Sequence, residues 1–146
     1  MYIEEIDITT LADQDDINLV TNSDSDKREK AIKMAMSEVR SYMRTRYRID
    51  QEFAKVGEAR NDFILLVVID VTLWHLFSML APRMGLETRK ERYDAAIRWL
   101  KDVRDGKTDP GIPSVDDPIS GGTDPVTNPE MFDTVRFGKT TNTSEW

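Results

Sequence analysis

Phe63-Ile64-Leu65-Leu66-Val67-Val68-Ile69 is the stretch that decides the fold of this chain. Seven consecutive apolar residues suit a buried strand, but the apolar character continues without a turn signal as far as Leu80. That length favours a helix over a strand, and Pro82 and Gly85 are residues that end helices. We therefore predict a helix over residues 63–80. Because it is apolar on most sides, it should lie at the centre of the domain.

A membrane span is the rival interpretation of this segment. Asp70 and His75 lie within it, and a central Asp costs roughly 2.5–3.5 kcal/mol on membrane-insertion scales. We therefore expect no contact with a membrane.

Helices are also expected on both sides of the central segment. Residues 9–20 form a short, weakly amphipathic helix at best, whereas residues 26–47 place apolar side chains at three- and four-residue steps and predict a helix of about 22 residues. Thr88 and Glu91 match a capping box that opens a further helix, which should end near Asp105-Gly106. The fold class is all-α, a small bundle of about four helices.

The C-terminal region has a different composition. From residue 107 onward lie five of the six prolines and four of the seven glycines, with no apolar period. We predict a helical domain over residues 1–106 and a long extended, mostly irregular arm over residues 107–146, with no core contribution beyond about residue 105. Fully extended, the arm could reach on the order of 130 Å. Its expected partner-binding anchors are Phe132, Val135, Phe137 and Trp146.

Charge alternates along the chain. Residues 1–26 carry eight acidic and no basic side chains, residues 27–107 carry 18 basic and 12 acidic, and residues 108–146 carry two basic and seven acidic. Such blocks suit complementary contacts between copies or with a partner of mixed charge, although an ordinary solvated surface would look the same.

Several chemistries are disfavoured by composition. The chain has no cysteine, which excludes disulfides, thiolate metal sites and cysteine nucleophiles, and it opens without a secretory signal, so folding in a cytoplasm is expected. His75 is the single histidine and is expected in the core or an interface. No phosphate-binding loop or common hydrolase motif occurs. We expect no enzyme activity, no metal and no cofactor.

The acidic run Asn22–Asp26 offers oxygen ligands at the spacing of a calcium loop. Lys27 and Lys33, however, stand where such a loop needs Gly and Glu. Capping of the following helix is the preferred explanation, because acidic side chains accept hydrogen bonds from the free amides at a helix start.

A helical projection places Lys33, Arg40, Arg44 and Arg48 on one arc, which we call the basic ridge. Pairing with another subunit is the favoured role. The alternative is a nucleic-acid-binding module in which Arg40, Arg44 and Arg48 follow the phosphates.

The same projection puts Arg46 inside the apolar arc, and Asp70 is the one charged residue of the central helix. An unpaired buried charge would cost several kcal/mol. We therefore predict that Arg46 and Asp70 form a buried pair that fixes helix register.

Ordered together, several segments resemble the phage Mu-type head–tail connector family over roughly residues 1–107. The segments that carry the resemblance are Met1-Tyr2-Ile3, the loop at Asn22–Asp26, Glu38-Val39-Arg40-Ser41-Tyr42-Met43-Arg44-Thr45-Arg46-Tyr47, Ile69-Asp70 ahead of Trp74 and Phe77, Glu91-Arg92-Tyr93-Asp94-Ala95-Ala96-Ile97-Arg98-Trp99-Leu100-Lys101-Asp102-Val103, and Asp105-Gly106-Lys107.

The resemblance implies a structural virion adaptor at the head–tail interface, assembled in the host cytoplasm. Copies would form a homo-oligomeric ring below the portal protein and offer a surface to a downstream neck or tail protein, close to the phage DNA in the channel. A ring of identical subunits needs heterologous contacts, for which the acidic N-terminal block and the basic ridge are candidate mates. The arm would reach a neighbour and become ordered on contact.

Overall fold

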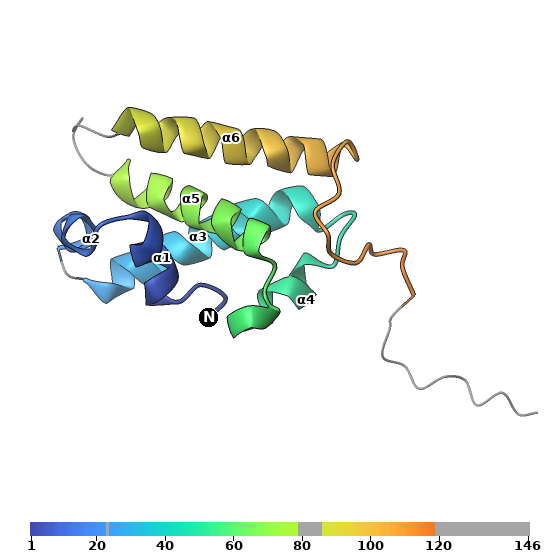
Figure 1. Ribbon diagram of the computed structural model, residues 1–146, viewed down its shortest axis with the longest axis horizontal. Coiled ribbons are helices and arrows are strands. Elements are labelled where there is room, and N and C mark those ends of the chain that lie inside the picture. The colour runs from blue at the N-terminus through green and yellow to red at the C-terminus, as the bar shows by residue number, and fades with distance from the viewer. Residues whose placement is uncertain (23, 79–85, 119–146) are drawn as a thin grey trace, which may run out of the picture.

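The structure is a computed structural model that describes residues 1–22, 24–78 and 86–118, and within these ranges it is all-α, as predicted. Figure 1 shows the order of the elements along the chain. They are α1 (Glu5–Leu11), α2 (Gln14–Thr21), α3 (Ser25–Met43), α4 (Ile49–Phe53), the short 3-10 helix η1 (Gly57–Ala59), α5 (Asp62–Phe77) and α6 (Leu86–Arg104).

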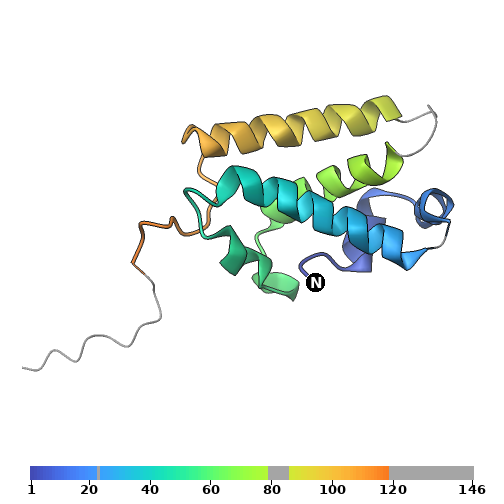
Figure 2. The same ribbon diagram turned by 180° about the vertical axis from the view of Figure 1, so that it is seen from behind.

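The bundle is built around α5, which packs against both α3 and α6. Helices α3 and α6 run in the same direction and α5 runs opposite to them, while α1 and α2 cover one end of the bundle (Figures 1 and 2). Half of α5 is fully buried, including Val68, Val71 and Leu73. The prediction of a central apolar helix over this segment is confirmed.

Side-chain caps set several helix starts. Asn61 accepts hydrogen bonds from the amides of Phe63 and Ile64, both at 3.1 Å, and so opens α5. Asp24 accepts from the amide of Asp26 at 2.9 Å and opens α3. The capping role predicted for the acidic run is therefore confirmed.

Element boundaries differ from the prediction in several places. The weak N-terminal helix is two short helices, and α3 ends at Met43 rather than Tyr47. Helix α5 ends at Phe77, and α6 begins at Leu86, so that Thr88 lies in the first turn instead of capping it. The predicted end of α6 is confirmed, since Gly106 follows it with a positive φ of 75°.

Residues 107–118, which we call the strap, fold back across the bundle end instead of leaving it. Ile112 is 7% exposed and belongs to the hydrophobic core. The expectation that nothing beyond residue 105 adds to the core was wrong. The cause is that one aliphatic side chain, Ile112, is buried from a segment rich in Pro and Gly, and a single buried residue has no period that a sequence pattern could reveal.

The described part of the chain contains no helix long and apolar enough to cross a membrane.

Candidate interaction surface

The strap is held by one arginine. The Arg48 side chain donates to the carbonyl oxygens of Ser114 (2.9 Å), Val115 (3.2 Å) and Asp117 (2.5 Å). Its backbone amide donates to the carbonyl of Pro113 at 2.9 Å. A guanidinium has five N–H donors in a planar fork and can serve several acceptors at once. Arg48 therefore fixes the direction in which the chain leaves the bundle.

A short antiparallel bridge adds to this anchorage. Tyr47 pairs with Ser114, and the amide of Val115 donates to the carbonyl of Arg46 at 2.9 Å. At the other end of the strap, the Asn61 side chain donates to the carbonyl of Pro110 at 3.2 Å. The residue that caps α5 thus also holds the strap.

The turn between α6 and the strap requires glycine. The amide of Gly106 bonds to the carbonyl of Val103 and that of Lys107 to the carbonyl of Asp102, a Schellman arrangement with Gly106 in the left-handed region. The Arg46 guanidinium covers this turn, since a Cβ placed on Gly106 would lie 2.5 Å from Arg46 Nη1. A larger side chain there would be strained by the positive φ and would require the exposed Arg46 side chain to move.

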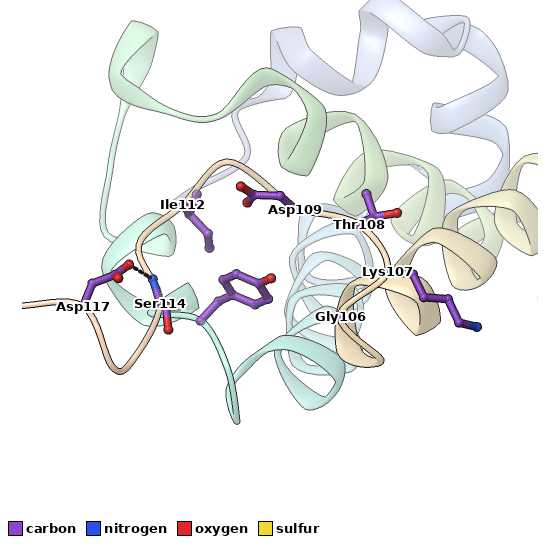
Figure 3. Close-up of a pocket in the computed structure, with 8 residues that line it drawn as sticks. Gly106, Lys107, Thr108, Asp109, Ile112, Ser114 and Asp117 are labelled. Atoms are coloured by element: carbon purple, nitrogen blue, oxygen red, sulfur yellow. Dashed lines mark hydrogen bonds between the residues drawn. The ribbon is translucent and has the colours of Figure 1, made fainter.

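An open pocket of about 470 Å³ lies between the strap and the loop after α3 (Figure 3). The Asp117 carboxylate accepts from the amide of Ser114 at 2.6 Å at one edge. The Lys107 side chain points away from the pocket, toward Asp102 at 3.5 Å. The lining residues are Tyr47, Gly106, Lys107, Thr108, Asp109, Ile112, Ser114 and Asp117.

The predicted Arg46–Asp70 pair does not form. Asp70 is only 11% exposed and is paired, but its partner is Arg92 of α6, at 2.8 Å. Arg46 is exposed and its Nη1 reaches the carbonyl of Arg104 at 3.4 Å. The helical projection failed because α3 ends at Met43, so Arg46 is no longer in helical register with the apolar face.

The basic ridge is partly used within the chain. Arg40 pairs with Asp50 at 2.6 Å and lies over the Phe53 ring, and Arg48 binds the strap. Lys33 pairs with Glu29 at 2.5 Å. Arg44 is exposed, and no ion pair holds it among the described residues. Partner binding by Arg40, Arg44 and Arg48 stays a prediction, with fewer free charges than the sequence indicated.

The predicted arm anchors Phe132, Val135, Phe137 and Trp146 lie outside the described residues.

A buried polar network at the N-terminus was not foreseen. Glu52 is 2% exposed and accepts from the Tyr2 hydroxyl (3.0 Å), the Asn61 amide (2.5 Å) and the Lys55 ammonium (2.7 Å). Burial alone raises the pKa of Glu52, but hydrogen bonds from Lys55, Asn61 and Tyr2 lower that pKa overall. Through these hydrogen bonds, the buried Glu52 holds the first residues of the chain against the segment between α4 and α5. No sequence pattern marks Glu52, because it lies in a five-residue helix.

A second ion pair secures the same region. Arg60 contacts both carboxylate oxygens of Asp7, at 2.6 and 3.2 Å, and also donates to the carbonyl of Tyr2 at 2.7 Å. The side chains of both partners are largely buried. Helix α1 is thereby fixed to the body of the bundle.

His75 belongs to a cluster that links the three long helices. Its Nε2 lies 2.8 Å from Glu38 Oε2, and the Tyr93 hydroxyl donates to Glu38 Oε1 at 2.8 Å. Trp74 stacks on the Tyr93 ring. The position agrees with the core or interface role predicted for the histidine. The described residues contain no group of three or more side chains suited to hold a metal ion.

Exposed charges that make no ion pair among the described residues occur at both ends of the bundle, acidic on α2 and basic near the C-terminal ends of α3 and α6. Helices α1 and α2 cover one end of the bundle (Figures 1 and 2), and Asp15 and Asp16 of α2 are exposed. The C-terminal ends of α3 and α6 lie together at the other end, where Arg44, Arg46, Arg98 and Lys101 are exposed. Basic residues also complement the negative ends of these helix dipoles.

The family model described as Bacteriophage Mu, Gp36 matches residues 2–127. The chain belongs to the Bacteriophage Mu Gp36 family. No curated protein and no solved structure matches it. The Gp36 match extends beyond the resemblance seen in the sequence, which stopped near residue 107, and it includes the whole strap.

Proposed function

We propose that this Gp36-family chain is a structural virion protein of a tailed phage, a head–tail connector or adaptor subunit. Copies form a ring under the portal and link the capsid to tail components. Membership of a bacteriophage family supports the phage context. The role is one of assembly, without catalysis.

The observation that supports the ring is a set of exposed charges that make no ion pair among the described residues, acidic on α2 and basic near the C-terminal ends of α3 and α6. A closed ring of identical subunits brings a different face of each copy against the next. The exposed acids on α2 of one subunit complement the exposed basic residues near the C-terminal ends of α3 and α6 of its neighbour, and such complementarity fixes register and speeds encounter. Asp15 and Asp16 at one end, and Arg44 and Lys101 at the other, are exposed and make no ion pair among the described residues.

The strap supports a role for the arm. Because Arg48 and Ile112 hold residues 107–118 against the bundle, the arm begins at a fixed point beside the loop after α3. From that point it extends to the portal or to a downstream neck protein. A fixed root limits the volume that the arm must search before it binds.

The proposal is tested by electron microscopy of the purified protein, alone and mixed with the portal, together with mass from light scattering. A ring in either sample is the expected result. Single subunits in both samples, at concentrations where the portal is intact, would overturn it.

Charge reversal tests the contact itself. We expect Asp15→Lys with Asp16→Lys to weaken assembly, Arg44→Glu with Lys101→Glu to do the same, and the four changes together to restore part of it. Glu58→Lys is the matched control, because Glu58 is exposed on η1. Equal assembly of all the variants would show that these charges do not contribute to the contact between subunits.

A further inference from the structure

We propose that the pocket under the strap is a receptor for the basic segment of the arm, Val135-Arg136-Phe137-Gly138-Lys139. In an isolated subunit the segment comes from the same chain. The inference does not depend on ring formation, since both the receptor and its occupant belong to one polypeptide.

The pocket carries two carboxylates with unused capacity. Asp109 Oδ1 accepts from the amide of Gly111 at 2.8 Å, and Asp117 Oδ2 accepts from that of Ser114 at 2.6 Å. The second oxygen of each carboxylate accepts no hydrogen bond within the described part of the chain. A carboxylate has room for several donors. The two free oxygens therefore suit a basic side chain.

The one positive charge in the lining is already neutralised. Lys107 Nζ lies 3.5 Å from Asp102 and 3.8 Å from Asp105, on the side away from the pocket (Figure 3). Neither of these aspartates lines the pocket. The lining itself therefore carries two carboxylates against one paired lysine, which favours a cation there. The guanidinium groups of Arg46 and Arg48 contact the lining from outside, Arg46 at Gly106 and Arg48 at the Ser114 and Asp117 carbonyls.

The remaining wall is aromatic and apolar. Tyr47 and Ile112 line the pocket beside the carboxylates. An arginine is attracted to the face of a tyrosine ring as well as to carboxylates, and apolar neighbours of that arginine gain from contact with Ile112. The pocket is open to solvent, and its volume of about 470 Å³ is large enough to admit an arginine side chain.

The arm offers one segment of matching chemistry. Arg136 and Lys139 are the two basic residues in residues 108–146, against seven acidic ones, and Val135 and Phe137 flank the arginine. Every other stretch of the arm is acidic or neutral. Asp109 and Asp117 would repel the acidic stretches and would not attract the neutral ones. The segment thus places apolar and aromatic side chains beside a basic one, and the pocket places apolar and aromatic side chains beside acidic ones.

The reach is sufficient. Arg136 follows Pro118 by 18 residues, which span up to about 60 Å when extended. Closing a loop of this length has a modest entropic cost, and the tether gives an effective concentration on the order of millimolar. In a dilute solution the same chain therefore outcompetes a second copy.

The experiment uses disulfide trapping in the full chain, which has no native cysteine. Thr108→Cys places a thiol in the pocket lining, and Gly138→Cys places one between Arg136 and Lys139, so that all four charged groups of the proposal are kept. At low micromolar concentration under mild oxidation, we expect an intramolecular disulfide, seen as a monomer on a non-reducing gel and by intact mass. Dimers as the main product contradict the same-chain arrangement.

The matched control is Val115→Cys with Gly138→Cys, because Val115 is exposed on the strap, carries no charge and does not line the pocket. We expect the Thr108 pair to close roughly tenfold faster than this control. Adding Arg136→Gln with Lys139→Gln should slow trapping by about three- to tenfold, as when two partly exposed ion pairs are lost. Asp109→Asn with Asp117→Asn should do the same, since Asn keeps an acceptor for the turn amides.

A second measurement needs no cysteine. In the full chain, Arg136→Gln with Lys139→Gln should shift the NMR signals of Tyr47 and Ile112 and leave those of Ile8 in α1 unchanged. Equal closure rates for the two cysteine pairs, or unchanged Tyr47 and Ile112 signals, overturn the proposal.

Discussion

Arg48 Nε donates to the carbonyl oxygen of Ser114 at 2.9 Å, a contact across 66 residues that joins the loop after α3 to the strap. The same guanidinium serves the carbonyls of Val115 and Asp117. An arginine predicted to face a partner therefore acts first inside its own subunit.

Replacing Arg48 should loosen the strap. Arg48→Met removes three hydrogen bonds from a charged donor, and we expect a loss of about 1–3 kcal/mol in the free energy of unfolding, with faster amide exchange at Val115. Arg44→Met, at an exposed position of the same loop, is the control and should change stability by less than about 0.5 kcal/mol. Urea unfolding and hydrogen exchange measure both effects. Equal stability of the two variants would mean that the strap is held by other contacts.

Two truncations separate the strap from the rest of the arm. A chain ending at Pro118 loses only the partly exposed contacts proposed for Arg136 and Lys139 and should be less stable by at most about 1 kcal/mol. A chain ending at Gly106 also loses the buried Ile112 and should be less stable by about 1.5–3 kcal/mol. Thermal unfolding of the two products is the measurement. If both melted with the full chain, Ile112 would contribute nothing to the core.

The pairing of Asp70 can be checked by a double-mutant cycle. Arg92→Met leaves a carboxylate that is 11% exposed without its partner, and we expect a cost of about 1–3 kcal/mol. The coupling between Asp70 and Arg92 should be about 1 kcal/mol, and that between Asp70 and Arg46 within about 0.5 kcal/mol of zero. A larger coupling to Arg46 would restore the pair predicted from the sequence.

Acid should weaken the N-terminal network. The pKa of Glu52 is lower in the folded chain than its ordinary value of 4.5, so its ionised form stabilises the fold above that value. This contribution is lost as pH falls through the folded pKa, that is, below about pH 4.5. Urea unfolding between about pH 3 and 7 should show the decline, and Glu52→Gln should lack that part of it. Parallel pH profiles for the two proteins would contradict the assignment.

Gly106 should resist substitution for two separable reasons. Gly106→Ala forces a side chain into a positive φ and against Arg46 Nη1, and we expect a loss of about 1–3 kcal/mol. Arg46→Ala in the same chain should recover the steric part and leave the backbone part. No recovery in the double variant would place the whole cost in the backbone.

The sequence predicted those elements whose apolar residues recur with a regular period or form a long run. Helix α5 followed from an apolar run too long for a strand, and the capping role of Asp24 followed from a polar run directly before an amphipathic period. The strap could not be predicted, because Ile112 stands alone between Pro110 and Pro113 and its burial depends on core residues that are distant in the sequence.

The candidate site was predicted less well than the fold. The pairing of Arg46 with Asp70 extended a helical projection three residues beyond the end of α3, and a small error in a boundary turns a side chain to another face. Glu52 was missed for a different reason. Its partners Tyr2, Lys55 and Asn61 come from three separate segments, and only the folded chain brings them together.

Because of the Schellman turn at Gly106 and the strap that follows it, the arm begins at residue 119, twelve residues later than the predicted start at Lys107. The 28 residues from 119 to 146 span at most about 90 Å, well short of the length expected when the arm was taken to begin at Lys107. In the proposed ring every arm would leave from the same height and radius, because its root is part of a folded bundle. The arms would then start at evenly spaced positions around the ring. The folded bundles would set that spacing, and the conformation of the arms would not affect it.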